Sequence, residues 1–230
     1  WSYEPGSIMK PLTFSAVLES GIGAPSSVRE VPGWVHVHDS DFRDSFPHEE
    51  EQWSISDILH RSSNVGTILW AVDLGEERLY ERLLEFGLGR TTELDFPGEA
   101  AGILPVVGKW SGTSLPTIAI GQGVAVTPLQ MVTAFSTIAN EGRRPAPTLV
   151  LGTRDTMGVF QPSERAPDQQ VLEPETSRQL LAMLERVVES GTGTRGQVPG
   201  YRVAGKTGTA WKPRPEGGYG EGSGNIDYVS

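Results

Sequence analysis

Apolar side chains recur at helical spacing in several parts of the chain, and residues that start or stop helices bound most of these segments. Leu12 and Val17 follow this spacing and predict a helix over residues 7–19, with Gly21 as its stop. Pro11 is tolerated only near the first turn of a helix. Ser7 is therefore expected at or close to the helix N-terminus.

The second helical region is divided in two by a polar interruption. Ser54 is a good N-cap, and Asp57, three residues later, makes the pair a variant of the capping box. The helix that they start is expected to end near Arg61. Residues 62–64, with the sequence Ser-Ser-Asn, interrupt the pattern, and a second helix is predicted over residues 65–72.

Further helices are predicted along the chain from the same combination of apolar spacing and terminal residues. They are a helix marked by Leu79, Leu83 and Leu84 and stopped by Gly87, one that runs from Thr127-Pro128 to Asn140-Glu141-Gly142, and one that opens at Pro174, carries Leu180, Leu184 and Val187 on one side and ends at Gly191.

Extended structure is expected in only a few places. Residues 21–53 are rich in proline, glycine and acidic residues and are predicted to form a linker with one short strand at 34–37. Residues 88–114 are predicted to be loop-rich. A strand is predicted over 201–210, and residues 226–230 resemble the opening of another strand. This mixture predicts a helix-rich α+β domain.

The composition of the 230 residues narrows the classes of function. The formal charge of −10 predicts no nucleic-acid partner, because the phosphate backbone would repel the chain. Cysteine is absent, which excludes disulfides and thiolate metal sites. No apolar run is long enough to span a membrane and no signal peptide is found. The chain opens without an initiating Met and reads as the middle of a protein, so the sequence leaves open a membrane anchor upstream in a longer parent.

Ser7 and Lys10 form an S-x-x-K pair at the start of the first predicted helix. Residues i and i+3 of a helix share a face, so the hydroxyl and the amine are expected to meet. A serine hydroxyl needs a base to act as a nucleophile, and a lysine whose pKa is depressed by burial can be that base. About one such pair is expected by chance in a chain of this length, so the pair alone is equally well explained by two surface side chains.

Two further motifs follow in the chain. Ser62 and Asn64 would place a hydroxyl and an amide in a loop between helices, facing one cleft, although ordinary helix capping explains them as well. Lys206, Thr207 and Gly208 would lie on a strand, where the lysine supplies a positive field for a substrate carboxylate and the glycine allows close approach by a substrate backbone. Motifs of these three kinds, in this order, occur in penicillin-binding proteins and class A β-lactamases.

The residues around the three motifs resemble class B penicillin-binding proteins of the division type over nearly the whole chain. The matching segments are Tyr3-Glu4-Pro5-Gly6-Ser7 with Lys10-Pro11, Ser62-Ser63-Asn64-Val65-Gly66, Phe86-Gly87-Leu88-Gly89, Pro97-Gly98-Glu99, Gly121-Gln122-Gly123, Thr127-Pro128-Leu129-Gln130-Met131, Ile138-Ala139-Asn140 and Gly205-Lys206-Thr207-Gly208-Thr209-Ala210.

The resemblance implies a fold as well as a function. It implies the α+β fold shared by penicillin-binding transpeptidases and β-lactamases, in which a helix cluster packs against an antiparallel sheet. It also implies that residues 1–230 are a partial transpeptidase domain, truncated at both ends, from which the N-terminal anchor, the pedestal and the flanking sheet strands are absent. Since unpaired buried strands are costly, the fragment alone is expected to be poorly stable and nearly inactive.

The resemblance also implies the catalytic roles. Ser7 would attack the carbonyl between the two terminal D-alanines of a peptidoglycan stem peptide, Lys10 would accept its proton, and Ser62 would relay a proton to the departing D-alanine. Lys206 is the fourth expected catalytic residue. The backbone N–H groups of Ser7 and Thr209 would hold the oxyanion. The amine of a second stem peptide would then complete the cross-link, with no cofactor or metal.

The substrate-binding residues implied by the resemblance are Asn64, for the peptide amide, and Thr207, Gly208 and Thr209, with Lys206, for the terminal carboxylate. The expected partners are stem peptides, β-lactam antibiotics, which would acylate the nucleophile stably, and other cell-division or cell-wall synthesis proteins. The expected location is the extracytoplasmic face of the bacterial membrane, which the parent reaches through a segment absent from this chain.

Other functions remain open at the level of sequence. A serine β-lactamase of class A needs a glutamate that activates water, and Glu93 and Glu99 lie between the second and third motifs without a convincing E-x-x-x-N pattern. The 144 positions between Ser62 and Lys206 also favour the transpeptidase. A D,D-carboxypeptidase differs only in using water as the acceptor. A β-lactam sensor domain would keep the same acylation site.

Two histidines are the remaining candidates for chemistry. His36 and His38 stand at i and i+2, where they would share one face of a strand as metal ligands. No third ligand of the right type lies nearby, so they are interpreted as histidines satisfied within a loop, and no metal is expected.

Overall fold

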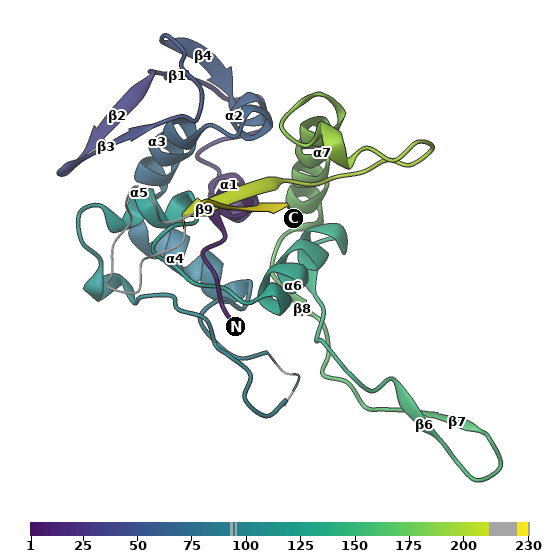
Figure 1. The fold of residues 1–230 in the computed structure, drawn as a ribbon. Helices are drawn as coiled ribbons and strands as arrows, with labels where there is room; N and C mark the ends of the chain where they lie inside the picture. The colour runs from purple at the N-terminus through teal and green to yellow at the C-terminus, as the bar shows by residue number, and fades with distance from the viewer. Residues whose placement is uncertain (93, 95, 212–224, 230) are drawn as a thin grey trace.

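A helical body with two-stranded β-pairs around it forms the domain, and one long arm projects from that body (Figure 1). The computed structural model describes residues 1–92, 94, 96–211 and 225–229; residues 210, 211 and 225–229 are described by their backbone alone. The seven α-helices of this part of the chain are α1 (Lys10–Glu19), α2 (Ile55–Arg61), α3 (Asn64–Leu74), α4 (Glu76–Glu85), α5 (Ser114–Ala119), α6 (Pro128–Ala139) and α7 (Pro174–Ser190). The 3-10 turns are η1 (Gly6–Met9), η2 (Val107–Lys109) and η3 (Thr194–Gly196).

Every described strand pairs antiparallel with one partner. The pairs are β1 (Val28–Val31) with β4 (Glu51–Ser54), β2 (Trp34–Val37) with β3 (Ser40–Arg43), β5 (Arg143–Arg144) with β8 (Gln169–Gln170), β6 (Gly152–Arg154) with β7 (Phe160–Pro162), and β9 (Thr207–Trp211) with β10 (Asn225–Val229).

Helix α1 lies at the centre of the body. Its residues 10–18 are all buried, including the lysine with which it begins. A helix that is buried on every side needs neighbours all round, and α1 contacts α2, α3, α4 and α7. Strand β9 crosses in front of it and contacts η1, which leads into the helix (Figure 1). The segment that carries Ser7 and Lys10 is therefore held between the core and β9.

Side-chain caps account for the helix boundaries that sequence predicts best. Ser54 caps α2 by accepting from Asp57 N, and the Asp57 carboxylate accepts from Ser54 N at 3.1 Å, which confirms the predicted capping box. Thr127 and Gln130 form the same reciprocal pair at the start of α6. The stop at Gly191 after α7 is also confirmed.

The first predicted helix starts differently from expectation. Residues 7–9 belong to the 3-10 turn η1, and the α-helix begins only at Lys10. The reason is Pro11, which has no N–H to donate to the Ser7 carbonyl in the α-helical pattern. The Lys10 N–H donates to Ser7 O instead, closing a 3-10 turn.

The predicted linker over residues 21–53 is wrong, because this stretch holds β1, β2, β3 and β4. The strand at 34–37 is confirmed, and it pairs with β3 in the register Trp34↔Arg43 to Val37↔Ser40. These strands have four residues each and are half exposed, so they lack a continuous apolar signal. The partners β1 and β4 are also far apart in sequence, which a local pattern does not reveal.

The strand predicted over 201–210 is shorter than expected at its start. It begins only at Thr207, because the preceding residues run along α7, where Gly205 N donates to Leu184 O at 3.3 Å. The last predicted strand is confirmed as β10, antiparallel to β9. The loop predicted over 88–114 includes the short turn η2, and α5, which begins at Ser114, was not predicted.

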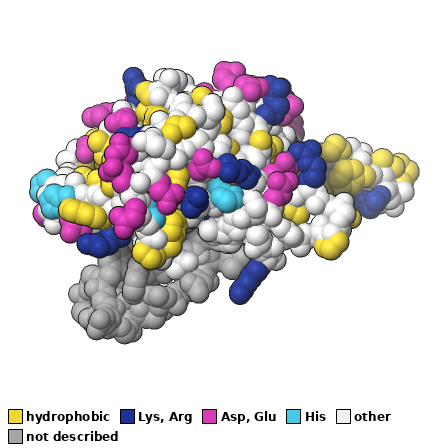
Figure 2. All heavy atoms as spheres, turned by 90° about the horizontal axis from the view of Figure 1, so that it is seen from above, with side chains coloured by type: hydrophobic (Ala, Val, Ile, Leu, Met, Phe, Trp, Pro, Cys, Tyr) yellow, Lys and Arg dark blue, Asp and Glu magenta, His cyan; other side chains and the backbone are white. Residues whose placement is uncertain are grey.

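The projecting arm carries β6 and β7 and the loops on either side of them (Figure 1). Figure 2 shows hydrophobic side chains gathered on this arm, away from the helical body. Its exposed hydrophobic residues are Leu149, Val150, Leu151, Met157, Val159 and Phe160. The arm thus contributes apolar surface and no core.

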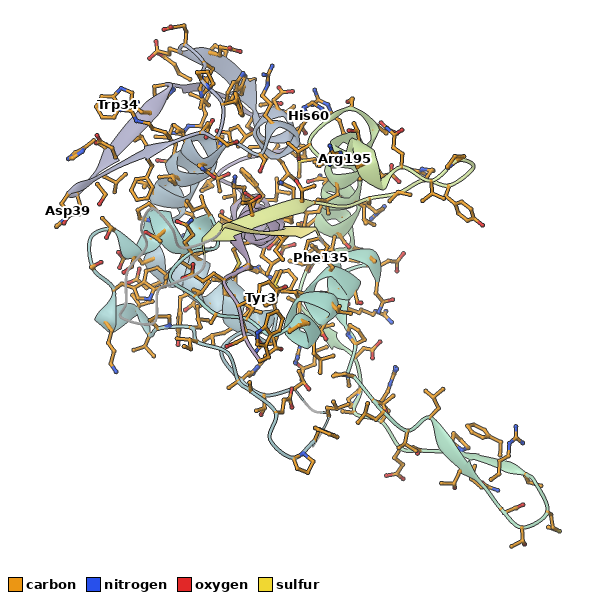
Figure 3. The ribbon with its side chains drawn as sticks, in the orientation of Figure 1. Tyr3, Trp34, Asp39, His60, Phe135 and Arg195 are labelled. Carbon is orange, nitrogen blue, oxygen red and sulfur yellow. The ribbon has the colours of Figure 1, made fainter. Side chains whose placement is uncertain are left out.

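Backbone contacts tie the N-terminal segment to the centre of the chain. Tyr3, labelled in Figure 3, exchanges both backbone hydrogen bonds with Val126, at 2.9 and 2.8 Å. Gly6 N donates to Gly121 O at 2.8 Å. Gly121 has φ +84°, and a Cβ at this position would stand 2.1 Å from Gly6 O. Only glycine allows this approach, which holds the turn immediately before Ser7.

We expect Gly121→Ala to destabilise the domain more than Gly158→Ala, which serves as the matched control. Both glycines have a positive φ, at +84° and +82°, but a Cβ at Gly158 meets nothing within 4 Å. Both variants should lose about 1 kcal/mol to backbone strain. Gly121→Ala should lose a further ~1–3 kcal/mol to the clash with Gly6. Urea unfolding of both variants measures this difference, and equal losses would contradict the close approach.

Candidate active site

The three sequence motifs meet at one hydroxyl, that of Ser62. Its Oγ accepts a hydrogen bond from Lys10 Nζ at 3.3 Å and another from Lys206 Nζ at 2.8 Å. Lys10 begins α1, Ser62 lies between α2 and α3, and Lys206 immediately precedes β9. Residues that are 52 and 144 positions from Ser62 are thereby brought to a single atom.

Two helix ends place Ser62 at this point. It is the C-cap of α2 and adopts the left-handed conformation, with φ 61° and ψ 36°. Ser63, the next residue, caps α3 by accepting from Gly66 N at 2.9 Å. Helix α2 also packs against α7, where His60 Nε2 (Figure 3) lies 3.1 Å from Ser190 Oγ. The predicted break between the helices is thus a turn whose geometry is set at both ends.

Lys10 is a buried amine with a depressed pKa. Besides the Ser62 hydroxyl, its Nζ donates to Ser62 O at 2.5 Å and to Asn64 Oδ1 at 2.8 Å. Burial lowers the pKa of Lys10 well below the ordinary lysine value, and the charge of Lys206 lowers it further, while Asp44 opposes both effects. A lysine in this environment is more readily neutral, as a general base must be.

Lys206 is also buried, and burial lowers its pKa to about 7. Its Nζ donates to the Ser62 hydroxyl and to Thr207 O, the latter at 3.0 Å. Near neutral pH the amine is therefore divided between its charged and neutral forms. The hydroxyl of Ser62 lies between two amines that both exchange protons readily, which suits it to relay a proton.

Ser7 lies half-buried in η1, one turn before Lys10. Within the described part of the chain its hydroxyl makes no hydrogen bond, so the two side chains that were expected to meet are not bonded to each other. The Ser7 N–H lies in the first turn of η1, where backbone donors have no partner within the helix. Its hydroxyl and its amide are both available to a substrate.

Asn64 is the first residue of α3 and does not lie in the predicted loop. Its side chain is engaged at both ends, because Oδ1 accepts from Lys10 and Nδ2 donates to Arg43 O at 3.0 Å. Its backbone N–H donates to Asp44 Oδ1 at 2.5 Å. Sequence reasoning missed Asp44, since a capping carboxylate is normally sought within three residues of the helix start and this one lies 20 residues away.

The third motif packs directly against the segment that carries Ser7. A Cβ at Gly208 would stand 2.8 Å from Ile8 Cγ2 and 3.0 Å from Pro5 O, so this glycine allows β9 to approach the chain around Ser7. Thr207 Oγ1 donates to Thr192 Oγ1 at 3.2 Å, a contact that sequence did not indicate. The Thr209 side chain is exposed.

His36 and Glu99 make their hydrogen bonds away from the residues of the three motifs. His36, on the exposed β2–β3 hairpin whose ends Trp34 and Asp39 mark in Figure 3, pairs with Asp41 through Nδ1 and Oδ1 at 2.8 Å. Glu99 Oε1 accepts from Thr92 N at 2.9 Å within its own loop, and Glu93 lies outside the described residues.

Comparison with known proteins gives the same family throughout. Residues 2–227 match the model of the penicillin binding protein transpeptidase domain. Penicillin-binding protein PbpB of Mycolicibacterium smegmatis is 40% identical over 93% of this chain, and peptidoglycan D,D-transpeptidase FtsI of Escherichia coli is 31% identical over 94% of it. Penicillin binding protein 3 of Mycobacterium tuberculosis, crystallised with aztreonam and with ampicillin, superimposes on 96% of the chain at 36% identity, with TM-scores of 0.90 and 0.91.

The relatives are considerably longer than this chain. It spans 34% and 35% of the two curated proteins, and 51% and 50% of the two crystallised chains. The match therefore concerns the region that holds all three motifs.

We expect the free energy of unfolding to rise with pH above about 7 because of Lys206. Between that pH and the ordinary lysine pKa, the unfolded chain binds a proton that the folded residue does not bind, and folding becomes more favourable as this difference develops. Below pH 7 both states bind the proton, and the folded state bears the full cost of the buried charge.

Lys206→Met should reduce this rise by an amount on the order of a few kcal/mol. Lys109→Met is the matched control, since Lys109 is exposed and should leave the pH profile unchanged. Urea unfolding of the three proteins between pH 6 and pH 10 measures the effect. A profile for Lys206→Met that coincides with the parent profile would show that Lys206 is not the group responsible.

Proposed function

The chain belongs to the penicillin-binding protein transpeptidase family, and we propose that it carries the reacting residues of a division-type D,D-transpeptidase that cross-links peptidoglycan stem peptides through an acyl-enzyme on Ser7. The observation that carries the proposal is the Ser62 hydroxyl, which accepts from two buried lysines. One of them, Lys10, follows the half-buried Ser7 by one turn. A surface serine and a surface lysine would have neither the burial nor the shared partner.

Acylation begins with proton transfer from Ser7. Neutral Lys10 accepts the proton of the Ser7 hydroxyl as Oγ forms a bond to the carbonyl carbon between the two terminal D-alanines. The lowered pKa of Lys10 supports this role, because a lysine at its ordinary pKa would be fully charged at neutral pH. The bond from this carbon to the leaving nitrogen then breaks, and Ser62 passes a proton from Lys10 to that nitrogen.

The backbone and the third motif stabilise and hold the substrate. The N–H groups of Ser7 and Thr209 donate to the oxyanion, and the loss of one such donor typically costs about 3–4 kcal/mol of barrier. Lys206, Thr207 and Thr209 bind the terminal carboxylate beside Gly208. The position of Lys206 at the start of β9, next to the segment that carries Ser7, supports this assignment.

Asn64 orients the peptide amide, and its hydrogen bond to Lys10 couples substrate binding to the base. Deacylation uses the amine of a second stem peptide, which attacks the acyl carbon and restores the Ser7 hydroxyl through the same proton path. A β-lactam presents a carbonyl similar to that of the D-Ala-D-Ala end, so it acylates Ser7. The acyl-enzyme that it forms is stable. The crystallised relative with aztreonam and with ampicillin supports this partner class.

The wider setting of the activity is inferred from the relatives. Their greater length supports residues 1–230 as part of the transpeptidase domain of a longer parent. In the part of the chain that the structure describes, no helix combines the length and the apolar character needed to cross a bilayer. We place the domain on the extracytoplasmic face of the bacterial membrane, where its substrate lies, together with other division proteins.

Hydrolytic alternatives differ from this function in the acceptor. A class A β-lactamase requires a glutamate beside the acyl-enzyme, and Glu99 is hydrogen-bonded within its own loop. A carboxypeptidase would release the acyl group to water, and a sensor would keep it bound. All of them share acylation at the same serine, so turnover distinguishes them.

Incubation of the full transpeptidase domain, of which residues 1–230 are a part, with a fluorescent penicillin should label it covalently at Ser7. Ser7→Ala should abolish the label, because it removes the hydroxyl that forms the bond to the acyl carbon. Ser163→Ala is the control, since this residue lies on the exposed arm and its loss should leave the labelling unchanged. Intact mass spectrometry checks the adduct, and a Ser7→Ala protein that is still labelled would exclude Ser7 as the nucleophile.

Ser62→Ala should slow acylation by roughly 10²- to 10⁴-fold, the range typical of a lost proton-transfer group.

The same assay on the unsubstituted domain, followed over hours, separates the transpeptidase from a β-lactamase. A stable adduct is expected, whereas rapid release of hydrolysed β-lactam would favour the β-lactamase.

A further inference from the structure

A buried carboxylate stands behind the second motif. The Asp44 side chain has no exposed surface, and its Oδ1 accepts from Asn64 N at 2.5 Å and from Val65 N at 2.9 Å. These are the first two N–H groups of α3, which have no partner within the helix. Asp44 follows β3, so a residue 20 positions away caps the helix in addition to the local cap by Ser63.

His48 holds this carboxylate from the other side. Its Nε2 lies 3.1 Å from Asp44 Oδ2, its Nδ1 lies 2.6 Å from Glu49 O, and its side chain is only 4% exposed. A carbonyl oxygen can only accept, so Nδ1 donates to Glu49 O, and this contact turns Nε2 toward the Asp44 carboxylate. The ring also packs on Trp53, with 4.5 Å between centroids. Asp44 is therefore fixed in one orientation.

The same short segment holds Asn64 twice. Asp44 binds its backbone N–H, and the carbonyl of Arg43 accepts from its Nδ2 at 3.0 Å. The remaining polar atom of the Asn64 side chain, Oδ1, accepts from Lys10 Nζ at 2.8 Å. The position of the Lys10 amine thus depends, through one amide, on the last residue of β3 and on the residue that follows it.

We propose that Asp44 is a positioning residue for acylation: its carboxylate, braced by His48, fixes the start of α3 and through Asn64 holds the Lys10 amine beside Ser62. This inference rests on the proposed function, in which Lys10 is the base. Asp44 acts on Lys10 by charge as well, because its carboxylate raises the pKa of Lys10 against the lowering by burial and by Lys206.

Two substitutions separate the cap from the charge. Asp44→Ala removes the acceptor and should slow acylation by a fluorescent penicillin roughly 10- to 100-fold, as expected for a misplaced base. Asp44→Asn keeps an acceptor of the same shape and removes the charge. Its acylation rate at neutral pH should stay closer to that of the unsubstituted domain. The acidic limb of its pH–rate profile should move to lower pH, because the loss of the carboxylate lowers the pKa of Lys10.

The control is Thr127→Ala, which removes a helix cap of the same kind at the start of α6. It should lower stability without changing the acylation rate or the pH profile. A rate for Asp44→Ala equal to that of Thr127→Ala would show that Asp44 is only a structural cap. If Asp44→Ala does not fold, an unmoved acidic limb in Asp44→Asn overturns the proposal.

NMR titration of the Lys10 side chain tests the inference without relying on acylation. The midpoint should fall in Asp44→Asn relative to the parent and remain unchanged in Thr127→Ala. Suppose that the unsubstituted domain is not acylated but the Lys10 titration midpoint still shifts in Asp44→Asn. This result would refute the proposed function and leave the coupling of Asp44 to Lys10 intact. An unchanged midpoint would refute the coupling, whatever the activity.

Discussion

Two buried amines that share one hydroxyl are the constraint on which the rest of the site depends. An ammonium group is costly to remove from water, and a second one nearby raises the cost through mutual repulsion. Lys10 and Lys206 bear this cost together, with the Ser62 hydroxyl as their common acceptor. The depressed pKa of each lysine follows from this burial, and a depressed pKa is the property that a lysine needs to act as a base.

The arrangement holds because three separate segments are packed to it at backbone distance. Gly208 brings β9 against the chain around Ser7, and Gly121 brings the centre of the chain against Gly6. The turn at Ser62 is set by the ends of α2 and α3. Each of these contacts lies next to a residue of the candidate site, so the packing that stabilises the core also fixes the geometry of the site.

The start of α3 links the hydrogen bonds around Lys10 to a helix cap. Helix α3 begins at Asn64, whose side chain reaches the amine and whose backbone is capped by Asp44. Since Asp44 follows β3, the outer strand pair β2–β3 is connected to the Lys10 amine. This small pair on the surface of the domain is in this way part of the support of the candidate active site.

The sequence by itself determined much of the local structure and which residues are the candidates for the chemistry. The caps at Ser54 and Thr127 lie within three residues of their partners, so the starts of α2 and α6 could be predicted. The order and the flanks of the three motifs were likewise sufficient to single out Ser7, Lys10, Ser62 and Lys206 as the candidates for the chemistry. Only the tertiary structure decided what these groups touch. The Asp44 cap, the glycine contacts of β9 and the strands within residues 21–53 all join positions far apart in sequence, and a local pattern holds no information on such partners.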